Sequence, residues 1–379
     1  MHIAFLTPEY PHEKLNRSGG LGTSIKNLAM ALLQKDVKVT VFVVYQSKNE
    51  EFEDEGVIIK SIAHKKYPFL GWYLERKRIQ KIVQKDISEN AINLIEAPDW
   101  TGVSAFMRFS IPLVIRIHGS DAYFCHLENR KQKWKNYFQE RNALTNANAI
   151  ISVSDFSGAL TTSIFKLKKK TKTIYNGIDI DKFSPSLECE PNQILYFGTL
   201  VRKKGVLELA QIFNLIIEKN PEAKLLLIGK DNMDVFEKKS TLSLFKSLLS
   251  SAASQQLNYI PEVPYNQVKS YISNASVVVL PSFAEAFPMT WLETMAMEKP
   301  LVASNIGWSK ELIENGITGY AINPTNHKTY AETIKSLLED KTLCHKVGKA
   351  ARQKIVNEFS MSLVVDKNIE YYKHIISKR

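Results

Sequence analysis

The chain has 379 residues, of which 44% are hydrophobic and 23% charged, and its formal net charge is +11. This length is too great for one compact core and fits two domains of ordinary soluble composition. No apolar run reaches the length of a transmembrane helix, and the three cysteines, Cys125, Cys189 and Cys344, lack metal-ligand spacing. Composition therefore argues against a membrane-spanning protein and a disulfide framework, and it favours a reducing cytoplasm.

The positive charge is concentrated in one segment. Between Lys60 and Lys172 there are 20 lysines and arginines against 9 aspartates and glutamates, a net charge of +11. A basic face attracts anionic partners such as a membrane surface or nucleic acid, although a solvated basic surface is the ordinary alternative. No helix-turn-helix, zinc-knuckle or RNA-binding aromatic motif accompanies the charge, so we expect no nucleic-acid partner.

The chain begins with an expected buried strand over residues 3–6, followed by a loop over residues 7–22 with three closely spaced glycines. There is no basic leader or cleavage site, so secretion is not expected. Thr23 or Ser24 is expected to cap the next helix, which precedes the strand VTVFVVY. A strand, a Gly-rich turn and a helix can bring backbone N–H groups close to a phosphate. Because G-x-G-x-x-G is absent, glycines that merely permit a tight turn are an equal interpretation of the local sequence.

A helix is expected over residues 73–87, with Leu74 and Ile82 among its inward positions and Arg76 among its outward ones. The loop before it, KKYPFLGWY, interleaves basic and aromatic residues. Such a loop can rest on an anionic bilayer with its rings among the headgroups. We therefore expect a peripheral membrane contact over residues 64–85, on the inner face of the cell membrane, while the helix itself packs on a sheet.

The runs INLIEAP and PLVIRIHG are expected strands, separated by a helix around residues 101–108, and a longer helix is expected over residues 130–147. His118 ends the second strand, at the carboxyl end where open α/β sheets bind ligands. A lone histidine is usually structural, so the position alone does not define a site.

The second half of the chain repeats the alternation of strands and helices. Residues 185–192 contain two prolines and mixed polar residues, which predicts a linker. The strand QILYFGT, the turn VRKKG and a helix over residues 207–219 follow, and then a strand AKLLLIG and a helical region around residues 235–250. This pattern predicts two doubly wound, Rossmann-like α/β domains, over residues 1–184 and 193–358.

Residues 281–304, PSFAEAFPMTWLETMAMEKPLVAS, are expected to form a loop, a helix beginning near Phe287 and a short strand, directly after the apolar strand SVVVL. Glu285 lies in the loop and Glu293 about one and a half turns into the helix. An anion on the helix N-terminus would lie between the two carboxylates, which would accept hydrogen bonds from flanking hydroxyl groups. A sugar, a diphosphate and a ribose have this order in a nucleotide sugar. On spacing alone, two solvated surface glutamates are the simpler interpretation.

The stretch 281–304 resembles the donor-site signature of the retaining glycosyltransferases of family four, which have the GT-B fold. RSGGLG is similar to the glycine loop of that family, VIRIHGSD to its histidine segment, APDWTG to its acceptor-side loop and KTIYNGIDIDKFSP to its approach to the linker. The resemblance covers nearly the whole chain. It implies two Rossmann-like domains facing a cleft, with the last segment, residues 359–379, crossing back to the first domain.

The resemblance also implies the activity: metal-independent transfer of a sugar from a UDP- or GDP-linked donor, with no other cofactor, to a hydroxyl of a glycan or lipid-linked acceptor. By analogy with the fold, we expect a role in bacterial surface polysaccharide or lipopolysaccharide synthesis. The residues implied are, for catalysis, His118, Arg202, Lys204 and Glu285; for donor binding, Gly19, Gly20, Thr199, Arg202, Lys204, Glu285, Ala286, Phe287, Met289, Thr290 and Glu293; and on the acceptor side, Asp99, Trp100 and Asp121. No metal ligand is expected.

Two positions depart from the family pattern. Thr199 stands where the family has an arginine, with Arg202 as the substitute, and Pro288 stands where a glycine N–H is common. Three alternatives remain open: another GT-B enzyme, such as a synthase of a small soluble glycoside or a nucleotide-sugar epimerase; a non-catalytic membrane-binding protein; and a basic nucleic-acid-binding protein. The sequence does not specify the donor base, the sugar or the acceptor.

Overall fold

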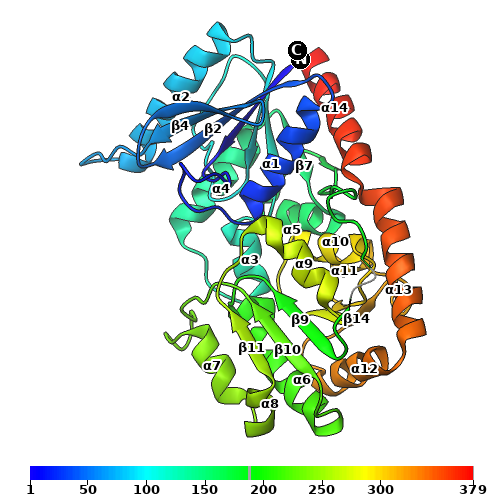
Figure 1. The fold of residues 1–379 in the computed structure, drawn as a ribbon. Helices are drawn as coiled ribbons and strands as arrows, with labels where there is room; N and C mark the ends of the chain where they lie inside the picture. The colour runs from blue at the N-terminus through cyan, green and yellow to red at the C-terminus, as the bar shows by residue number, and fades with distance from the viewer. Residues whose placement is uncertain (187–188, 379) are drawn as a thin grey trace. The chain divides into compact units, whose positions relative to one another are not determined.

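The computed structural model describes residues 1–186 and 189–378, which divide into two compact units (Figure 1). Unit 1 comprises Met1–Gly177 and Met361–Arg379, and unit 2 comprises Ile178–Ser360. The sequence placed residues 178–184 in the first domain, but they belong to unit 2, where Ile178 N donates to Phe359 O at 3.0 Å and Arg352 donates to Phe183 O at 3.1 Å. The expected linker, 185–192, includes residues 187 and 188, which lie outside the described residues.

Unit 1 contains an eight-stranded sheet in the order β3-β4-β2-β1-β5-β6-β7-β8, parallel except for the antiparallel pair β3 and β4. Its strands are β1 (His2–Thr7), β2 (Lys38–Gln46), β3 (Glu50–Asp54), β4 (Val57–Ala63), β5 (Leu94–Pro98), β6 (Leu113–Ile117), β7 (Ala149–Ser152) and β8 (Thr171–Thr173). The parallel strands are buried apolar runs, as expected for a sheet covered on both faces. The β3–β4 hairpin was not predicted, because β3 consists mostly of acidic residues.

The helices of unit 1 are α1 (Gly20–Leu33), α2 (Gly71–Glu89), α3 (Asp121–Leu127), α4 (Trp134–Asn146), α5 (Asp155–Phe165) and α14 (Met361–Ser377). Helices α1 and α14 pack side by side and share one apolar cluster with one face of the sheet, and α2 packs in a second cluster on the other face (Figure 1). The last helix of the chain is therefore part of the core of unit 1.

A buried polar network attaches α14 to this sheet. Arg116 on β6 forms two hydrogen bonds with Glu96 on β5, at 2.7 and 2.9 Å, and donates to Asn368 at 2.5 Å. The Tyr372 hydroxyl donates to Glu96 at 2.6 Å. All four side chains are buried, so each charge and each polar atom in the network depends on its partners.

Two predictions for unit 1 were wrong: the helix over residues 101–108 and the outward position of Arg76. Both are explained by the turn at Gly102. Residues 101–108 form turns instead of a helix, because Gly102 has φ +64° and a Cβ there would lie 2.5 Å from the Gln139 carbonyl group on α4. The turn needs donors for its carbonyl groups, and Arg76 donates to Gly102 O at 3.1 Å. Arg76 therefore points inward and is 6% exposed, whereas Leu74 and Ile82, expected inside, are 40% and 39% exposed respectively.

Helix α1 also begins earlier than expected. Its N-cap is Gly19, so neither Thr23 nor Ser24 is the capping residue. A Cβ at Gly22 would lie 1.9 Å from Ser18 Oγ and 3.2 Å from the Glu9 backbone. The glycine is needed because the first turn of α1 packs directly on the loop that follows β1.

Unit 2 contains a six-stranded parallel sheet in the order β11-β10-β9-β12-β13-β14. Its strands are β9 (Gln193–Phe197), β10 (Lys224–Ile228), β11 (Leu257–Ile260), β12 (Val277–Leu280), β13 (Leu301–Ser304) and β14 (Tyr320–Ile322). This is the strand order of a doubly wound Rossmann sheet, and it confirms the predicted fold class for this half of the chain.

The helices of unit 2 are η1 (Arg202–Lys204), α6 (Val206–Lys219), α7 (Thr241–Leu248), α8 (Ser251–Gln255), α9 (Tyr265–Asn274), α10 (Met289–Ala296), α11 (Ser309–Leu312), α12 (His327–Glu339), α13 (Lys341–Lys354) and η2 (Ile355–Phe359). The predicted helices over residues 207–219 and after Phe287 are present. The helical region expected around residues 235–250 begins later, at Thr241, because Ser240 caps it by accepting from Ser243 N.

Candidate functional site

The topology of unit 2 places its candidate site at the carboxyl ends of β9 and β12. These two strands are neighbours, but the chain leaves β9 toward β10 on one side and leaves β12 toward β13 on the other. At such a switch point the loops diverge and leave a crevice, the usual ligand position in open α/β sheets. The loops that follow β9 and β12 contain Lys204 and Glu285 respectively.

Lys204 and Glu285 form an ion pair at this point. Lys204 Nζ lies 2.8 Å from Glu285 Oε1, and Ser282 Oγ donates to the same oxygen at 3.1 Å. Both side chains are partly accessible, at 24% for the lysine and 13% for the glutamate. The structure thus brings together two residues that lie 81 positions apart in the sequence, and each keeps some accessible surface for a ligand.

Gly205 explains how the two loops come so close. It has φ +69°, and a Cβ there would lie 1.9 Å from Pro281 O. The backbone of the β12 loop also donates to the β9 loop, from Phe283 N to Lys203 O at 2.7 Å. A side chain at position 205 would push the loops apart and separate Lys204 from Glu285.

Glu293 lies inside α10 and is 3% exposed. The Tyr265 hydroxyl donates to its Oε1 at 2.8 Å. Burial raises the pKa of Glu293 to about 7, against the lowering effects of the Tyr265 hydrogen bond and of Lys182 and Lys204. This carboxyl group therefore titrates near neutral pH. The sequence predicted Glu293 as a ligand residue, and it gave no signal for Tyr265 or Lys182.

Arg202, which was expected to act on the donor phosphates, has a partner within unit 2. Its guanidinium group donates to both oxygens of Asp234, at 2.9 and 3.1 Å, and lies 5.3 Å from the Phe236 ring centroid. The Asp234 side chain is fully buried, and Arg202 lowers the pKa of Asp234 by hydrogen bonding. Arg202 thus ties its turn to the loop after β10, a role that the sequence did not indicate.

The remaining donor-side candidates surround the start of α10 and the end of β9. Ala286 and Phe287 are buried, and the Phe287 ring packs against Phe359 with centroids 5.5 Å apart. Met289 and Thr290 form the first turn of α10, after Pro288 as the N-cap, and both are half-buried. Thr199 is exposed just after β9. Their roles as donor ligands stay predictions.

In unit 1, Asp99 and His118 meet at the carboxyl ends of β5 and β6. His118 N donates to Asp99 Oδ1 at 2.9 Å, so the aspartate is bonded to the histidine backbone and not to its ring. Asp99 is completely buried, and burial raises its pKa to about 7. Burial and the nearby Arg116 guanidinium lower the pKa of His118, which keeps the imidazole neutral at physiological pH.

Asp121 is the first residue of α3, and a second buried acid lies beside it. Glu140 accepts hydrogen bonds from Asp121 N at 2.8 Å, Ala122 N at 3.1 Å and Gln132 Nε2 at 2.9 Å. Burial raises the pKa of Glu140 to about 8, with a further contribution from the charge of Asp99. The acceptor-side candidate Asp121 is therefore hydrogen-bonded to Glu140, which the sequence missed, and Asp99 acts on Glu140 through its charge.

Three candidates of unit 1 are exposed. Trp100 follows Asp99 and is 42% exposed. Gly19 and Gly20 lie at the start of α1, where Gly19 N donates to a Glu9 carboxylate oxygen. An acidic side chain thus already occupies one N–H group of the glycine loop. Across the described ranges, no three His, Cys, Asp or Glu side chains gather as metal ligands.

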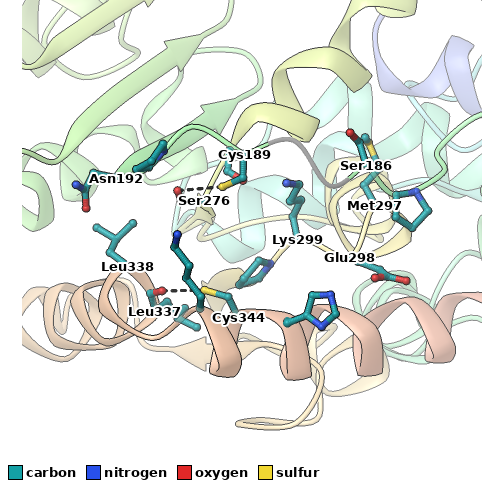
Figure 2. Close-up of a pocket in the computed structure, with 16 residues that line it drawn as sticks. Ser186, Cys189, Asn192, Ser276, Met297, Glu298, Lys299, Leu337, Leu338 and Cys344 are labelled. Carbon is teal, nitrogen blue, oxygen red and sulfur yellow. Dashed lines mark hydrogen bonds between the residues drawn. The ribbon is translucent and has the colours of Figure 1, made fainter.

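A cavity of about 530 Å³ opens at the other end of the unit 2 strands from the Lys204–Glu285 pair (Figure 2). It lies at the amino ends of β9, β12 and β13, and buried Lys299 lines it together with Cys189 and Cys344 (Figure 2). The Cys344 thiol donates to Leu337 O at 2.8 Å, and Cys189 contacts Ser276 Oγ at 3.3 Å. Both thiols thus contact residues that line the same cavity. None of the sequence-predicted ligand residues lines it.

Two family models match successive parts of the chain. The model "Glycosyl transferases group 1" matches residues 178–354, and the model "Glycosyltransferase Family 4" matches residues 18–182. The capsular polysaccharide biosynthesis glycosyltransferase CapM of Staphylococcus aureus is 28% identical over 244 residues, which cover 60% of this chain and 62% of CapM. The match with CapM therefore spans less than two thirds of either protein.

Solved structures match over the full length. Sucrose-phosphate synthase from Thermosynechococcus elongatus has a TM-score of 0.84 at 19% identity and covers 100% of both chains. HepE of Anabaena in complex with UDP-glucose has a TM-score of 0.74 at 17% identity and covers 99% of this chain and 100% of its own. These similarities show the GT-B fold, and the two family models show that the chain is a glycosyltransferase. The chain belongs to glycosyltransferase family four, the glycosyl transferases group 1.

Proposed function

We propose that this protein is a retaining, metal-independent glycosyltransferase that moves a sugar from a nucleotide-diphosphate donor to an acceptor hydroxyl. The observation that carries the proposal is the Lys204–Glu285 ion pair at the switch point of unit 2, close to the start of α10. A cation beside the N–H groups of a helix N-terminus suits a diphosphate, and a neighbouring carboxylate suits the hydroxyl groups of the attached sugar.

In this proposal each group acts on a different part of the donor. Lys204 and the first N–H groups of α10 hold the diphosphate and stabilise the charge that grows as the sugar–phosphate bond breaks. Glu285 accepts hydrogen bonds from sugar hydroxyls, and Glu293 from the ribose. The acceptor oxygen forms its bond to the anomeric carbon on the face from which the diphosphate departs, and its proton passes to the departing phosphate oxygen. His118 contributes by orientation and Arg202 by its charge, and neither acts as a nucleophile.

The donor proposed is a UDP- or GDP-linked sugar, and the acceptor a glycan or a lipid-linked saccharide used for surface polysaccharide. The family membership supports the first part, as does the solved complex of HepE with UDP-glucose. The similarity to CapM, a capsular polysaccharide biosynthesis glycosyltransferase, supports the second.

A lipid-linked acceptor would require the enzyme to approach a membrane. Among the described residues no helix is long and apolar enough to cross one. Phe69 and Leu70, ahead of α2, are 81% and 63% exposed, and they lie next to Lys65 and Lys66. Exposed apolar side chains beside basic ones favour peripheral contact with an anionic bilayer. We therefore keep the segment 64–85 as the proposed membrane contact of a cytoplasmic enzyme.

A synthase of a small soluble glycoside is the second candidate. The similarity of the whole fold to sucrose-phosphate synthase supports it, because the product in that enzyme's name, sucrose phosphate, is a small soluble glycoside. The two candidates share the donor site and differ in the acceptor.

Product analysis tests the proposal. The purified protein is incubated with radiolabelled UDP-glucose, UDP-N-acetylglucosamine, GDP-mannose or ADP-glucose and with either a membrane extract or a mixture of soluble sugars and sugar phosphates. We expect label in the lipid fraction, with the donor's anomeric configuration by proton NMR and no loss of activity in EDTA. Label in a soluble glycoside would favour the second candidate. An inverted product, or an EDTA-sensitive reaction, would contradict the proposed mechanism.

A further inference from the structure

Glu293 is the proposed ribose ligand, yet its carboxyl group lies in surroundings that oppose its charge. The residue is 3% exposed, and burial penalises the ionised form. Three groups from three parts of unit 2 act in the other direction: Tyr265 on α9, Lys182 near the start of the unit, and Lys204 in η1. A carboxylate that must accept hydrogen bonds from a ligand needs such support to stay ionised.

Tyr265 makes a direct contact with this carboxyl group. Its hydroxyl donates to Glu293 Oε1 at 2.8 Å, a hydrogen bond to the side chain from a separate helix. The ring is held in turn, because Lys182 Nζ lies 4.8 Å from the ring centroid and the Phe183 ring lies 6.1 Å away. A ring held by its neighbours fixes the direction of its hydroxyl, so Tyr265 can fix the orientation of the Glu293 carboxylate.

We propose that Tyr265 is a positioning residue for the donor site, whose hydroxyl holds the Glu293 carboxylate in the orientation and charge state that accepts hydrogen bonds from the ribose. This inference rests on the proposed function and deepens it. Lys182 supports the same arrangement in two ways: it contacts the Tyr265 ring, and its charge favours the ionised form of Glu293. Tyr265 occupies Oε1, so in this proposal Oε2 is the oxygen that accepts from the ribose.

Donor binding should depend on pH through the Glu293 carboxyl group. Burial, opposed by Tyr265, Lys182 and Lys204, places the pKa of Glu293 at about 7. Donor affinity should therefore rise as the pH rises through about 7, because the ionised carboxylate is the stronger acceptor. Removal of the Tyr265 hydroxyl takes a donor from the ionised form, which raises the pKa of Glu293 further and moves this transition to higher pH.

The test is the binding of nucleotide sugars to Tyr265→Phe. UDP-glucose, GDP-mannose and ADP-glucose are first titrated into the wild type by calorimetry, and the tightest binder is measured from about pH 5.5 to about pH 8.5. These diphosphate esters do not change charge in that range. We expect Tyr265→Phe to shift the midpoint of the affinity curve up by about one pH unit, which is about a fivefold loss near pH 7 that shrinks at high pH.

Matched variants separate positioning from a general structural effect. Tyr271→Phe removes a hydroxyl from the same helix and should leave the midpoint unchanged. Glu293→Gln should bind weakly and without a midpoint, since the titrating group is gone. Lys182→Met provides a second route to the same result if Tyr265→Phe does not fold, with Lys269→Met as its control, and it should also raise the midpoint.

The results distinguish this inference from the proposed function. If the wild type binds one nucleotide sugar but Tyr265→Phe has an unchanged midpoint, or loses affinity equally at every pH, the positioning role is wrong and the donor site stands. If the wild type binds none of the three donors, the proposed function is contradicted and this inference with it.

Discussion

The two units contain the same kind of sheet but use their acidic residues differently. In unit 1 both carboxylate oxygens of buried Glu96 and Glu140 accept hydrogen bonds from the protein: Glu96 from Arg116 and Tyr372, and Glu140 from two backbone N–H groups and a glutamine. In unit 2, Glu285 pairs with Lys204 and both keep accessible surface at the switch point. Acids of the first kind maintain a fold, whereas acids of the second kind are available to a ligand.

This difference predicts that substitutions at similar positions of the two sheets have different effects on folding and activity. Asp99 in unit 1 and Glu285 in unit 2 both follow a strand at its carboxyl end. Asp99 is completely buried and accepts from the His118 backbone, so its charge organises the loop. A substitution there should change folding and activity together, but at Lys204 or Glu285 activity should change while the fold remains.

The largest expected effect on stability is at the buried network of unit 1. Arg116→Met leaves the Glu96 carboxylate buried without its cation, and we expect a loss of about 3–5 kcal/mol in the free energy of unfolding. Urea denaturation measures it. The exposed pair Lys35–Asp366 is the control, and Lys35→Met should cost less than about 1 kcal/mol. Equal losses in the two variants would contradict the distinction between buried and exposed pairs.

The largest expected effect on activity is at the ion pair of unit 2. Lys204→Ala removes the cation proposed to stabilise the departing diphosphate, so kcat should fall by about 10²–10³-fold with unchanged urea stability. Arg202→Met should reduce kcat less and should lower stability, because it leaves buried Asp234 without its partner. Lys219→Ala, at the far end of α6, serves as the control. The reverse order of Lys204 and Arg202 would show that the arginine acts on the donor.

The pH dependence of unfolding tests the role of the buried acid Glu140 in unit 1. Burial raises the pKa of Glu140 to about 8, above its value of roughly 4.3 in an unfolded chain. A carboxyl group with a raised folded pKa stabilises the protonated fold, and this contribution is lost as the pH rises from the unfolded value to the folded one. Wild type should therefore lose stability relative to Glu140→Gln between about pH 5 and about pH 8. A constant difference in urea midpoints across this range would contradict the argument.

The smallest expected effect concerns the membrane contact. Replacement of Phe69 and Leu70 by serine removes two exposed apolar side chains, and we expect about a tenfold loss of binding to vesicles that contain anionic lipid. Ile317→Ser, in a second exposed apolar position that belongs to unit 2, should leave vesicle binding unchanged. Vesicle sedimentation measures both, and equal binding by all three proteins would contradict a contact at this segment.

The sequence predicted the parts of the fold that depend on local patterns. Buried apolar runs predicted most strands, and helical spacing predicted α2 and α6, because these elements need no knowledge of their neighbours. The last segment, α14, was expected only from the family resemblance. The prediction failed where the partner is distant in sequence: Arg76 points inward only because the turn at Gly102 needs donors for its carbonyl groups. The same limit applies to the site. The motif proposed Glu293 as a donor ligand, but it gave no indication of the hydrogen bond from Tyr265.

The central claim is that the carboxyl edge of the unit 2 sheet binds a nucleotide sugar through Lys204, Glu285 and Glu293. The most direct test is calorimetric titration of wild type and Glu293→Ala with UDP-glucose, GDP-mannose and ADP-glucose, with Glu339→Ala on α12 as the control. We predict that wild type and the control bind one of these donors equally and that Glu293→Ala binds it at least about tenfold more weakly. Equal binding by Glu293→Ala, or no binding by the wild type, would contradict the account.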